Sequence, residues 1–239
     1  MIFLICEKQD KQNVHLTIIF ALQKNMFMRK LILLLGFTIP SIISMAQEKD
    51  AGKQSIFFRL GAGYGQRLNP VQGELDAEGQ KHYSRLRRGG NLSLQIGYFI
   101  SEKDAFALVY TRLGSKAENT ITGNKRKSLV NTSFAGLTYQ RFIPVGDKKD
   151  VNFNLKLGPG FLFYREESTL INGTTGVSSQ QDYSKRNPGL ITGIGFDFKL
   201  SKNVRFELNA DKTWGRIKEN SKNINLGVFS LGAGLRFQF

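Results

Sequence analysis

The sequence predicts an all-β fold, an eight-stranded antiparallel up-and-down transmembrane β-barrel. Three observations predict it: an export-like N-terminal segment, about eight segments in which apolar and polar residues alternate, and an apolar C-terminal stretch that stops on phenylalanine. The composition agrees, because 25 glycines and 19 phenylalanines beside only 5 prolines suit strands better than helices.

Residues 28–46 have the pattern of a cleaved signal peptide. After Met28 they contain two basic residues, Arg29 and Lys30, and then an apolar run over 31–43. They end with small residues up to Ala46, after which we expect cleavage. A membrane-anchoring helix is the alternative, but the run is shorter than the roughly 20 residues that a helical span needs, and Pro40 interrupts it.

Residues 1–27 have a patchy apolar pattern without an evident role, and we interpret them as an extension upstream of the true start. The candidate start codons are Met1, Met26 and Met28. The expected mature domain is 47–239. It contains no cysteine, since the single cysteine of the chain is Cys6, so disulfides and cysteine-based metal sites are excluded from it.

Period-two alternation runs through the mature part of the chain. Around Leu94 and Ile96, for example, apolar residues alternate with Ser93, Gln95 and Gly97. Successive side chains of a strand face opposite sides, so each such strand has one apolar and one polar face. The expected strands are 55–66, 89–100, 105–114, 128–143, 151–164, 188–200, 204–214 and 223–239. The fourth alternates poorly and the eighth shifts phase near Val228, and a bulge would explain either.

The expected connections alternate in length. Residues 101–104, 144–150 and 201–203 are short turns, the polar segments 67–88, 115–127 and 165–187 are long loops, and 215–222 is intermediate. Short turns at one end and long loops at the other are typical of a membrane barrel whose long loops lie outside.

A soluble eight-stranded barrel of the lipocalin type is the structural alternative, and it would place apolar side chains inside. The polar face here carries glycines and isolated charges, which suits a narrow lumen better than a water-facing surface. We expect these charges to pair across strands and to fill the lumen, because eight strands leave room for little more than side chains. The expected lumen charges are Arg59, Lys156, Asp197, Lys199, Arg205, Glu207 and Asp211.

In the last residues, every second side chain counted back from the end is apolar, with Leu235, Phe237 and Phe239 as the final three. This resembles the terminal signal of bacterial outer-membrane barrels, which implies recognition by the barrel assembly machinery. Residues 47–239 as a whole resemble the OmpA-type and OmpX-type eight-stranded barrels, and most of all the Bacteroidetes-type outer membrane protein beta-barrel domain family. The resemblance implies architecture and location in the cell outer membrane, and it implies no appended peptidoglycan-binding domain.

Motifs that carry chemistry are scarce. Residues 61–66 look briefly like a dinucleotide loop, but the last glycine is missing and no helix is expected to follow. His82, the only histidine of the mature chain, has Ser84 two residues away, which is not a catalytic triad. We therefore expect no enzymatic activity, no metal and no cofactor.

Basic residues gather where the long loops end: Arg85, Arg87, Arg88, Lys125, Arg126, Lys127, Lys185 and Arg186. Solvated loop charge is the plain interpretation. The sharper one is contact with lipopolysaccharide phosphates, because guanidinium groups suit phosphate and strand ends lie at headgroup height. The full chain has a net charge of +15, yet an exported barrel is not expected to meet nucleic acid.

The sequence thus leaves three classes of function. We expect a non-enzymatic, monomeric outer-membrane barrel with a structural or surface-interaction role, a filled lumen and a basic rim that contacts lipopolysaccharide or a partner. A narrow conduit for small or apolar solutes is the alternative, and a lipid-modifying hydrolase is the third class. A cluster of histidine, serine and carboxylate would favour the hydrolase.

Overall fold

A computed structural model describes residues 56–68, 77–121, 124–146, 150–219 and 222–239. The expected extension and signal peptide, residues 1–46, lie outside the described residues. Within the described part of the chain, no helix has the length and apolar character that a membrane crossing requires.

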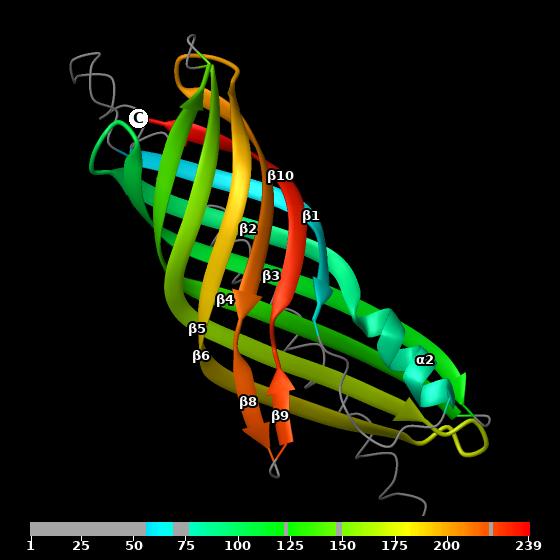
Figure 1. Cartoon of the computed structure of the whole chain (residues 1–239). Helices are drawn as coiled ribbons and strands as arrows, with labels where there is room; N and C mark the ends of the chain where they lie inside the picture. Colours follow the sequence, from blue (N-terminus) through cyan, green and yellow to red (C-terminus); the bar gives the residue numbers. More distant parts are fainter. Residues whose placement is uncertain (1–55, 69–76, 122–123, 147–149, 220–221) are drawn as a thin grey trace, which may run out of the picture. The chain divides into compact units, whose positions relative to one another are not determined.

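Eight strands form one closed antiparallel barrel, which confirms the predicted fold class (Figure 1). Each strand pairs with its neighbours along the chain, and the last strand pairs with the first, from Phe57↔Gln238 to Arg67↔Val228. The barrel strands are β1 (Ile56–Arg67), β2 (Arg88–Phe99), β3 (Asp104–Ile121), β4 (Asn124–Val145), β5 (Val151–Ile171), β6 (Ser178–Lys199), β7 (Val204–Trp214) and β10 (Val228–Gln238).

The two ends of the barrel differ. Three short connections, from β2 to β3, from β4 to β5 and from β6 to β7, join strand ends at the end of the barrel that holds the C-terminus, which we call the turn end. The opposite end, the loop end, carries helix α2 (Ala77–Leu86) and a small hairpin of β8 (Arg216–Glu219) and β9 (Lys222–Asn225). The three short connections at the turn end were predicted, but the long connections at the loop end differ from the prediction.

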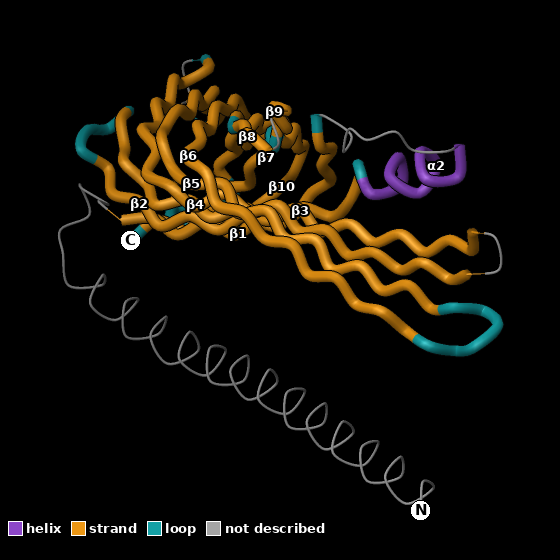
Figure 2. The backbone as a smooth tube through the Cα atoms, turned by 90° about the horizontal axis from the view of Figure 1, so that it is seen from below, coloured by secondary structure: helices purple, strands orange, loops and turns teal. Residues whose placement is uncertain are grey.

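Two of the predicted long loops are wrong, because they are mostly strand. β3 and β4 pair without interruption as far as Ile121↔Asn124, and β5 and β6 as far as Ile171↔Ser178. These extensions project well beyond the rest of the barrel (Figure 2). Outside a membrane both faces of such strands can be polar, so they lack the apolar alternation by which the membrane-crossing part was recognised.

Three further details correct the prediction. Helix α2 was not expected in the first long loop. The expected eighth strand does not contain a bulge near Val228, since β9 ends at Asn225 and the barrel strand begins anew at Val228. β4 keeps one register with β3 along its length, and its alternation is weak because Phe134 faces the lumen while Leu137 faces outward.

In the membrane-crossing part of the strands, alternate residues are buried and exposed, and the exposed set is mostly apolar. On β5 the exposed outward residues include Leu155, Leu157, Phe161 and Phe163, while Lys156 between them is buried. An apolar outer face and a polar inner face are what a barrel surrounded by lipid requires. Residues 153–163 supply a crossing of suitable length, since a tilted strand needs roughly 9–11 residues.

Candidate functional site

The lumen nearest the turn end holds a network of buried charges. The Arg59 Nε lies 2.5 Å from the Glu207 Oε2, and the Arg236 Nε lies 3.3 Å from the other Glu207 oxygen. Asp197 accepts hydrogen bonds from Arg205, at 2.9 Å, and from Arg236. All five side chains are nearly inaccessible to solvent. Buried ions are costly unless they are paired and hydrogen-bonded. Each of the five is ion-paired, and Asp197 is hydrogen-bonded, but the Nε and Nη1 atoms of Arg59 and Arg236 have no hydrogen-bond partner among the described residues.

A second buried pair lies farther toward the loop end. The Lys156 Nζ is 2.8 and 2.9 Å from the two carboxylate oxygens of Asp211. Gly193 makes this approach possible, because a Cβ there would lie 2.1 Å from the Asp211 Oδ1 and 2.9 Å from the Lys156 Cε. Gly193, on the polar face of β6, thus leaves the space that the Lys156–Asp211 pair occupies.

Six of the seven lumen charges expected from the sequence face one another in these two groups. The seventh, Lys199, corrects the expectation: it stands at the end of β6, exposed, because the strand has already left the barrel interior there. Arg236 was missed, although it connects Asp197 to Glu207. The sequence signal was present, since Arg236 occupies the polar phase of the terminal strand, between Leu235 and Phe237.

Aromatic rings close the lumen at the turn end. Phe57, Phe99 and Phe142 have ring centroids 5.2 to 6.4 Å apart. The Arg236 guanidinium carbon lies 4.2 Å from the Phe142 centroid, so the cluster also covers the charge network. A Cβ on Gly97 would lie 2.2 Å from the Phe57 ring, so glycine is required where this ring packs.

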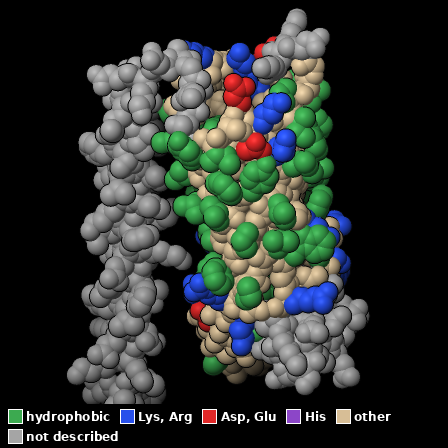
Figure 3. All heavy atoms as spheres, turned by 60° about the vertical axis from the view of Figure 1, so that its left-hand side comes forward, with side chains coloured by type: hydrophobic (Ala, Val, Ile, Leu, Met, Phe, Trp, Pro, Cys, Tyr) green, Lys and Arg blue, Asp and Glu red, His purple; other side chains and the backbone are tan. Residues whose placement is uncertain are grey.

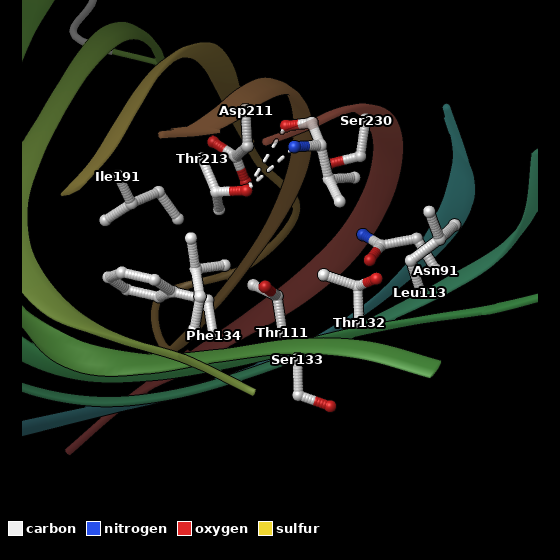
Figure 4. Close-up of a pocket in the computed structure, with 12 residues that line it drawn as sticks. Asn91, Thr111, Leu113, Thr132, Ser133, Phe134, Ile191, Asp211, Thr213 and Ser230 are labelled. Atoms are coloured by element: carbon white, nitrogen blue, oxygen red, sulfur yellow. Dashed lines mark hydrogen bonds between the residues drawn. The ribbon is translucent and has the colours of Figure 1, made fainter. Parts of the chain in front are cut away.

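An apolar layer follows on the side of the loop end, where Leu113, Phe134, Leu162 and Ile191 are almost fully buried. Figure 4 shows several of these side chains around a residual cavity whose polar lining includes Asp211. The cavity has a volume of about 10 Å³. That is close to the space for about one water molecule. The described side chains thus leave little open volume in this layer.

Helix α2 covers the inner face of the extended strands at the loop end. Arg67, at the end of β1, donates hydrogen bonds to the Leu86 carbonyl, to the Val130 carbonyl at 2.9 Å and to Thr132 at 2.9 Å. Leu86 is buried beside Val130 in the apolar cluster. Burial lowers the pKa of Arg67 to about 10. The helix C-terminus is therefore held by a guanidinium group that rises from the barrel wall.

His82 of α2 is fully buried and does not contact Ser84 as part of any catalytic group. Its Nε2 lies 3.0 Å from the Ser128 Oγ, while the exposed Ser84 donates to the Lys81 carbonyl. Burial, followed by the positive charge of Arg126, lowers the pKa of His82. The separation from Ser128 would suit a base and a nucleophile. With His82 at 0% and Ser128 at 2% exposure, however, a substrate has no access to either atom.

Outside the barrel, basic side chains gather beyond the apolar band, and Figure 3 shows this on one face. One row of the sheet carries Arg112 on β3 and Arg186 on β6, with Ser133 and Phe163 between them. The Arg186 guanidinium carbon lies 4.1 Å from the Phe161 ring centroid. On β7, the Lys212 Nζ lies 3.5 Å from the centroid of Trp214. We call Arg112, Arg186 and Lys212 the outer basic belt.

The eight basic residues expected at the rim do not act as one surface. By strand alternation Arg88, Lys125, Lys127 and Arg186 face outward, whereas Arg126 and Lys185 lie on the inner face. Arg126 donates to the Ser168 hydroxyl at 3.4 Å, and the Lys185 Nζ lies 5.5 Å from the Tyr183 ring centroid. Arg85 lies on the exposed part of α2, and Arg87, partly buried, follows the helix.

Several of the outward cations are already paired with carboxylates. Glu118 forms ion pairs with Lys125 at 2.5 Å and with Lys127 at 3.8 Å. The side chain of Arg165 is paired with Glu167 and with Asp182. The three belt residues differ, because the described residues include no carboxylate within ion-pair distance of them. Arg112 and Lys212 were missed because each lies inside a strand rather than in a basic cluster.

The last residues complete the wall. Leu235 is exposed on the outward face, Phe237 and Phe239 are partly buried, and the Phe239 backbone exchanges hydrogen bonds with Ile56. The terminal strand therefore closes the barrel against β1. Among the described residues, no group of three or more His, Cys, Asp or Glu side chains is arranged to hold a metal ion.

Known structures with similar folds are small membrane barrels. Neisserial surface protein A is 17% identical with a TM-score of 0.41, and the alignment covers 77% of this chain and 97% of that one. The Ail protein of Yersinia pestis is 18% identical with a TM-score of 0.41 over 77% and 100% of the two chains. A major outer membrane protein of Thermus thermophilus is 12% identical with a TM-score of 0.48, and the alignment covers 77% of this chain and 98% of that one.

No curated protein gives a significant match to this chain. The model of one family does match, over residues 34–237, which is most of the chain and includes all eight barrel strands almost to the end of the last one. The chain belongs to the family of the outer membrane protein beta-barrel domain.

Proposed function

We propose that this protein is a non-enzymatic outer-membrane barrel that binds the phosphates of lipopolysaccharide through its outer basic belt. The observation that carries the proposal is the pair Arg186 and Lys212, two outward cations held over aromatic rings and not neutralised by a carboxylate among the described residues. The loop end faces outside the cell in this proposal, as long connections do in bacterial barrels.

The position of the belt supports this proposal. On β6 the outward apolar residues end at Pro188, and Arg186 is the next outward residue. On β7, Lys212 stands beside Trp214, and aromatic residues prefer the membrane interface. A cation at that height meets the headgroup phosphates of the outer leaflet. Aromatic contact limits the conformations of both side chains, which lowers the entropy lost on binding.

Charge availability decides which cations matter. A cation that is already paired with a carboxylate offers less net charge to a phosphate. The Lys125–Glu118–Lys127 group carries +1 in total (two lysines and one glutamate), whereas Arg186 and Lys212 together carry +2, which favours the latter two. Each available charge near an anionic surface contributes about 1 kcal/mol, so the double variant Arg186→Gln/Lys212→Gln should bind lipopolysaccharide roughly 30-fold more weakly at low salt.

The matched control is Lys125→Gln/Lys127→Gln, which removes the same formal charge from the group that is paired with Glu118. Binding of lipopolysaccharide to the purified barrel in nanodiscs, measured at low and high salt, compares the two. We expect the control to lose much less affinity than the belt variant, and salt to reduce the difference. Equal losses in both variants would contradict the assignment of binding to the belt.

The filled lumen argues against the conduit alternative. From the turn end toward the loop end, the lumen contains the Phe57 cluster, then the paired charges, then the apolar layer. We therefore propose that the protein carries no steady ion current. Planar-bilayer recording checks this, and a stable, large single-channel conductance would favour a conduit.

We also propose that the terminal strand is read by the barrel assembly machinery and that the barrel is monomeric, with no nucleic-acid partner. Deletion of Phe239 should reduce the fraction of protein that reaches the folded, heat-modifiable form in cells. A substitution of the exposed Lys202 in a turn should leave that fraction unchanged. Equal assembly of the truncated chain would contradict the terminal-signal interpretation.

A further inference from the structure

We propose that the outer edge of β6, residues 178–186, binds an extended segment of a second protein as an added strand. The segment carries a carboxylate and, six residues away, an apolar side chain. The proposal goes beyond the lipid binding proposed above and does not depend on it, because it uses a strand edge rather than the outward face. It rests on the exposure of that edge, on a depression beside it and on the position of one lysine.

β6 has different neighbours along its two sides. On one side it pairs with β5 as far as Ile171↔Ser178, but on the other side it pairs with β7 only from Leu190 toward the turn end. The side chains of residues 178–182 and 184–186 are exposed, whichever face of the sheet they lie on. Asn187 donates to the Arg216 carbonyl, so the hairpin of β8 and β9 limits this edge on the barrel side. The backbone groups of an edge strand are a template for a further strand.

The opposite edge of the extended sheet, on β3, is flanked by a helix. Arg85 of α2 donates a hydrogen bond to the Glu118 backbone carbonyl at 3.4 Å. Figure 2 shows α2 on the side of the β3–β4 hairpin, away from the teal loop that joins β5 to β6. The two edges of the extended sheet therefore differ, and the edge of β6 is the one open to a partner.

The edge of β6 lacks the usual protection against pairing. Natural edge strands are protected by lysine, by proline or by a bulge. Residues 178–184 contain no lysine or proline, and their pairing with β5 keeps one register without a bulge. Their one charge, Asp182, is bound to Arg165 at 2.9 Å. An incoming strand thus meets a regular, extended backbone.

A depression lies beside the edge at the end of β6 that is farthest from the barrel. Its lining includes Val177 and the directly opposed pair Leu170↔Ser179, and its volume is about 380 Å³. Leu170 has the inner phase of β5, two residues after the buried Ser168. Leu170 and Val177 are 43% and 68% exposed. Opposed residues of paired strands share a face, so a side chain opposite Ser179 lies at the depression, and an apolar one covers the exposed apolar surface.

Lys185 supplies the charge that selects the other end of the segment. It has the same inner phase as Ser179 and stands six residues closer to the barrel. Its Nζ lies 5.5 Å from the Tyr183 ring centroid, and the described residues include no carboxylate within ion-pair distance of it. Residues six apart in an extended strand share a face. The segment that fits therefore runs antiparallel to β6, with an acidic residue first and an apolar residue six positions later.

A synthetic peptide of nine residues has this pattern, with glutamate at position 2, valine at positions 4 and 6, leucine at position 8 and threonine at the odd positions. Fluorescence anisotropy of a labelled peptide measures its binding to the full-length protein in nanodiscs. Two further peptides are N-methylated, one at the even and one at the odd positions, because a strand pairs through alternate residues. We expect one of these to lose roughly tenfold in affinity while the other binds like the parent. No binding of the parent, or equal losses in both methylated forms, would overturn the inference.

Two protein variants test the two ends of the segment. Lys185→Gln and Leu170→Thr change exposed side chains, so both should keep the heat-modifiable mobility of the folded barrel. Each should weaken binding of the parent peptide severalfold, and Lys185→Gln should not affect a peptide whose glutamate is replaced by threonine. The control is Lys125→Gln, which removes the same charge from an exposed lysine of β4 and should not weaken binding. An equal loss in the control would indicate general charge attraction and reject the inference.

Hydrogen exchange locates the bound peptide. Exchange of residues 178–186 should slow when the peptide is added, whereas exchange of residues 115–121, at the edge beside α2, should not change. If residues 178–186 are fully protected before peptide is added, a second copy or another segment of the chain already occupies the edge, and the inference is wrong. Slower exchange at residues 115–121 instead would also overturn it.

Discussion

Charge is abundant both inside the barrel and on the outside of its extended strands, but it serves opposite purposes in the two regions. In the lumen, Asp197 is fully buried between Arg205 and Arg236. Outside, Glu118 pairs with Lys125 and Lys127 while all three remain exposed. The same ions are strongly coupled in a protein interior and largely screened in water. The ion pairs of the lumen therefore stabilise the barrel interior. The outer pairs contribute little stability, and they determine only which cations remain available to bind phosphate.

Buried apolar side chains also fall into two regions, the closed barrel and the contact between α2 and the extended strands. Phe134 and Leu162 fill the closed barrel, whereas Leu86 and Val130 join α2 to the wall beyond it. A side chain in the barrel contributes to the stability of the whole hydrogen-bonded ring. A side chain under α2 contributes to a local unit that can open separately. Four predictions test these contrasts, from the largest expected effect to the smallest.

Asp197→Asn should have the largest effect, because it leaves Arg205 and Arg236 buried with one carboxylate fewer. Loss of one partner of a buried ion pair costs about 3–5 kcal/mol. Urea unfolding in lipid bilayers, followed by the fluorescence of Trp214, the single tryptophan of the chain, should show this loss. A change within measurement error would mean that water or rearrangement solvates the network.

Phe134→Ala should come next, with a loss of about 3 kcal/mol in the free energy of unfolding, because the apolar layer cannot collapse around the missing ring. The same measurement applies, and a matched substitution of a lipid-facing ring, Phe161→Ala, is the control. An equal loss in the control would show that the apolar layer of the lumen contributes no more to the free energy of unfolding than a lipid-facing ring does.

Leu86→Ala should scarcely move the global unfolding transition, although Leu86 is as buried as the lumen residues. The cavity it leaves weakens only the docking of α2. Limited proteolysis should therefore cut near residues 77–88 several times faster than in the unchanged protein. A fall in global stability like that of Phe134→Ala would show that α2 and the barrel unfold as one unit.

Removal of a charge at the turn end should have the smallest effect. The hydrogen bond from Tyr139, followed by that from Ser101, lowers the pKa of Asp104. Since a depressed carboxyl pKa adds stability that is present at neutral pH and lost as the pH falls through the folded pKa, Asp104→Asn should be slightly less stable than the unchanged protein at neutral pH. The difference should vanish in strong acid, and a constant difference would contradict this origin.

Much of the barrel wall could be read from the sequence because lipid imposes a strict rule. Each crossing strand must place apolar residues outward, so the alternation around Leu94 or Leu155 marks both the strand and its faces. That phase also assigned Arg59, Lys156 and Asp197 to the inner face, where they are buried. Phase alone does not ensure burial, because Lys199 shares the phase of Asp197 and is exposed at the end of β6.

Beyond the membrane the rule no longer applies, and the prediction failed there. The extensions of β3–β6 carry polar residues on both faces, so strand and loop look alike in the sequence. Helix α2 has a similar ambiguity, because a short polar helix in water is held by its contacts rather than by its propensity. Its contacts with Arg67 and Ser128 come from parts of the chain that are remote in sequence.

The sequence by itself thus determined the eight crossings and the phase of most strands, because these depend on local patterns that the membrane enforces. Tertiary structure alone decided which charges meet. Barrel closure brings Arg236 to Asp197, and the pairing of β3 with β4 lets Glu118 pair with Lys125 and Lys127. The register of distant strands sets these distances, and alternation specifies the face of a residue but not its partner.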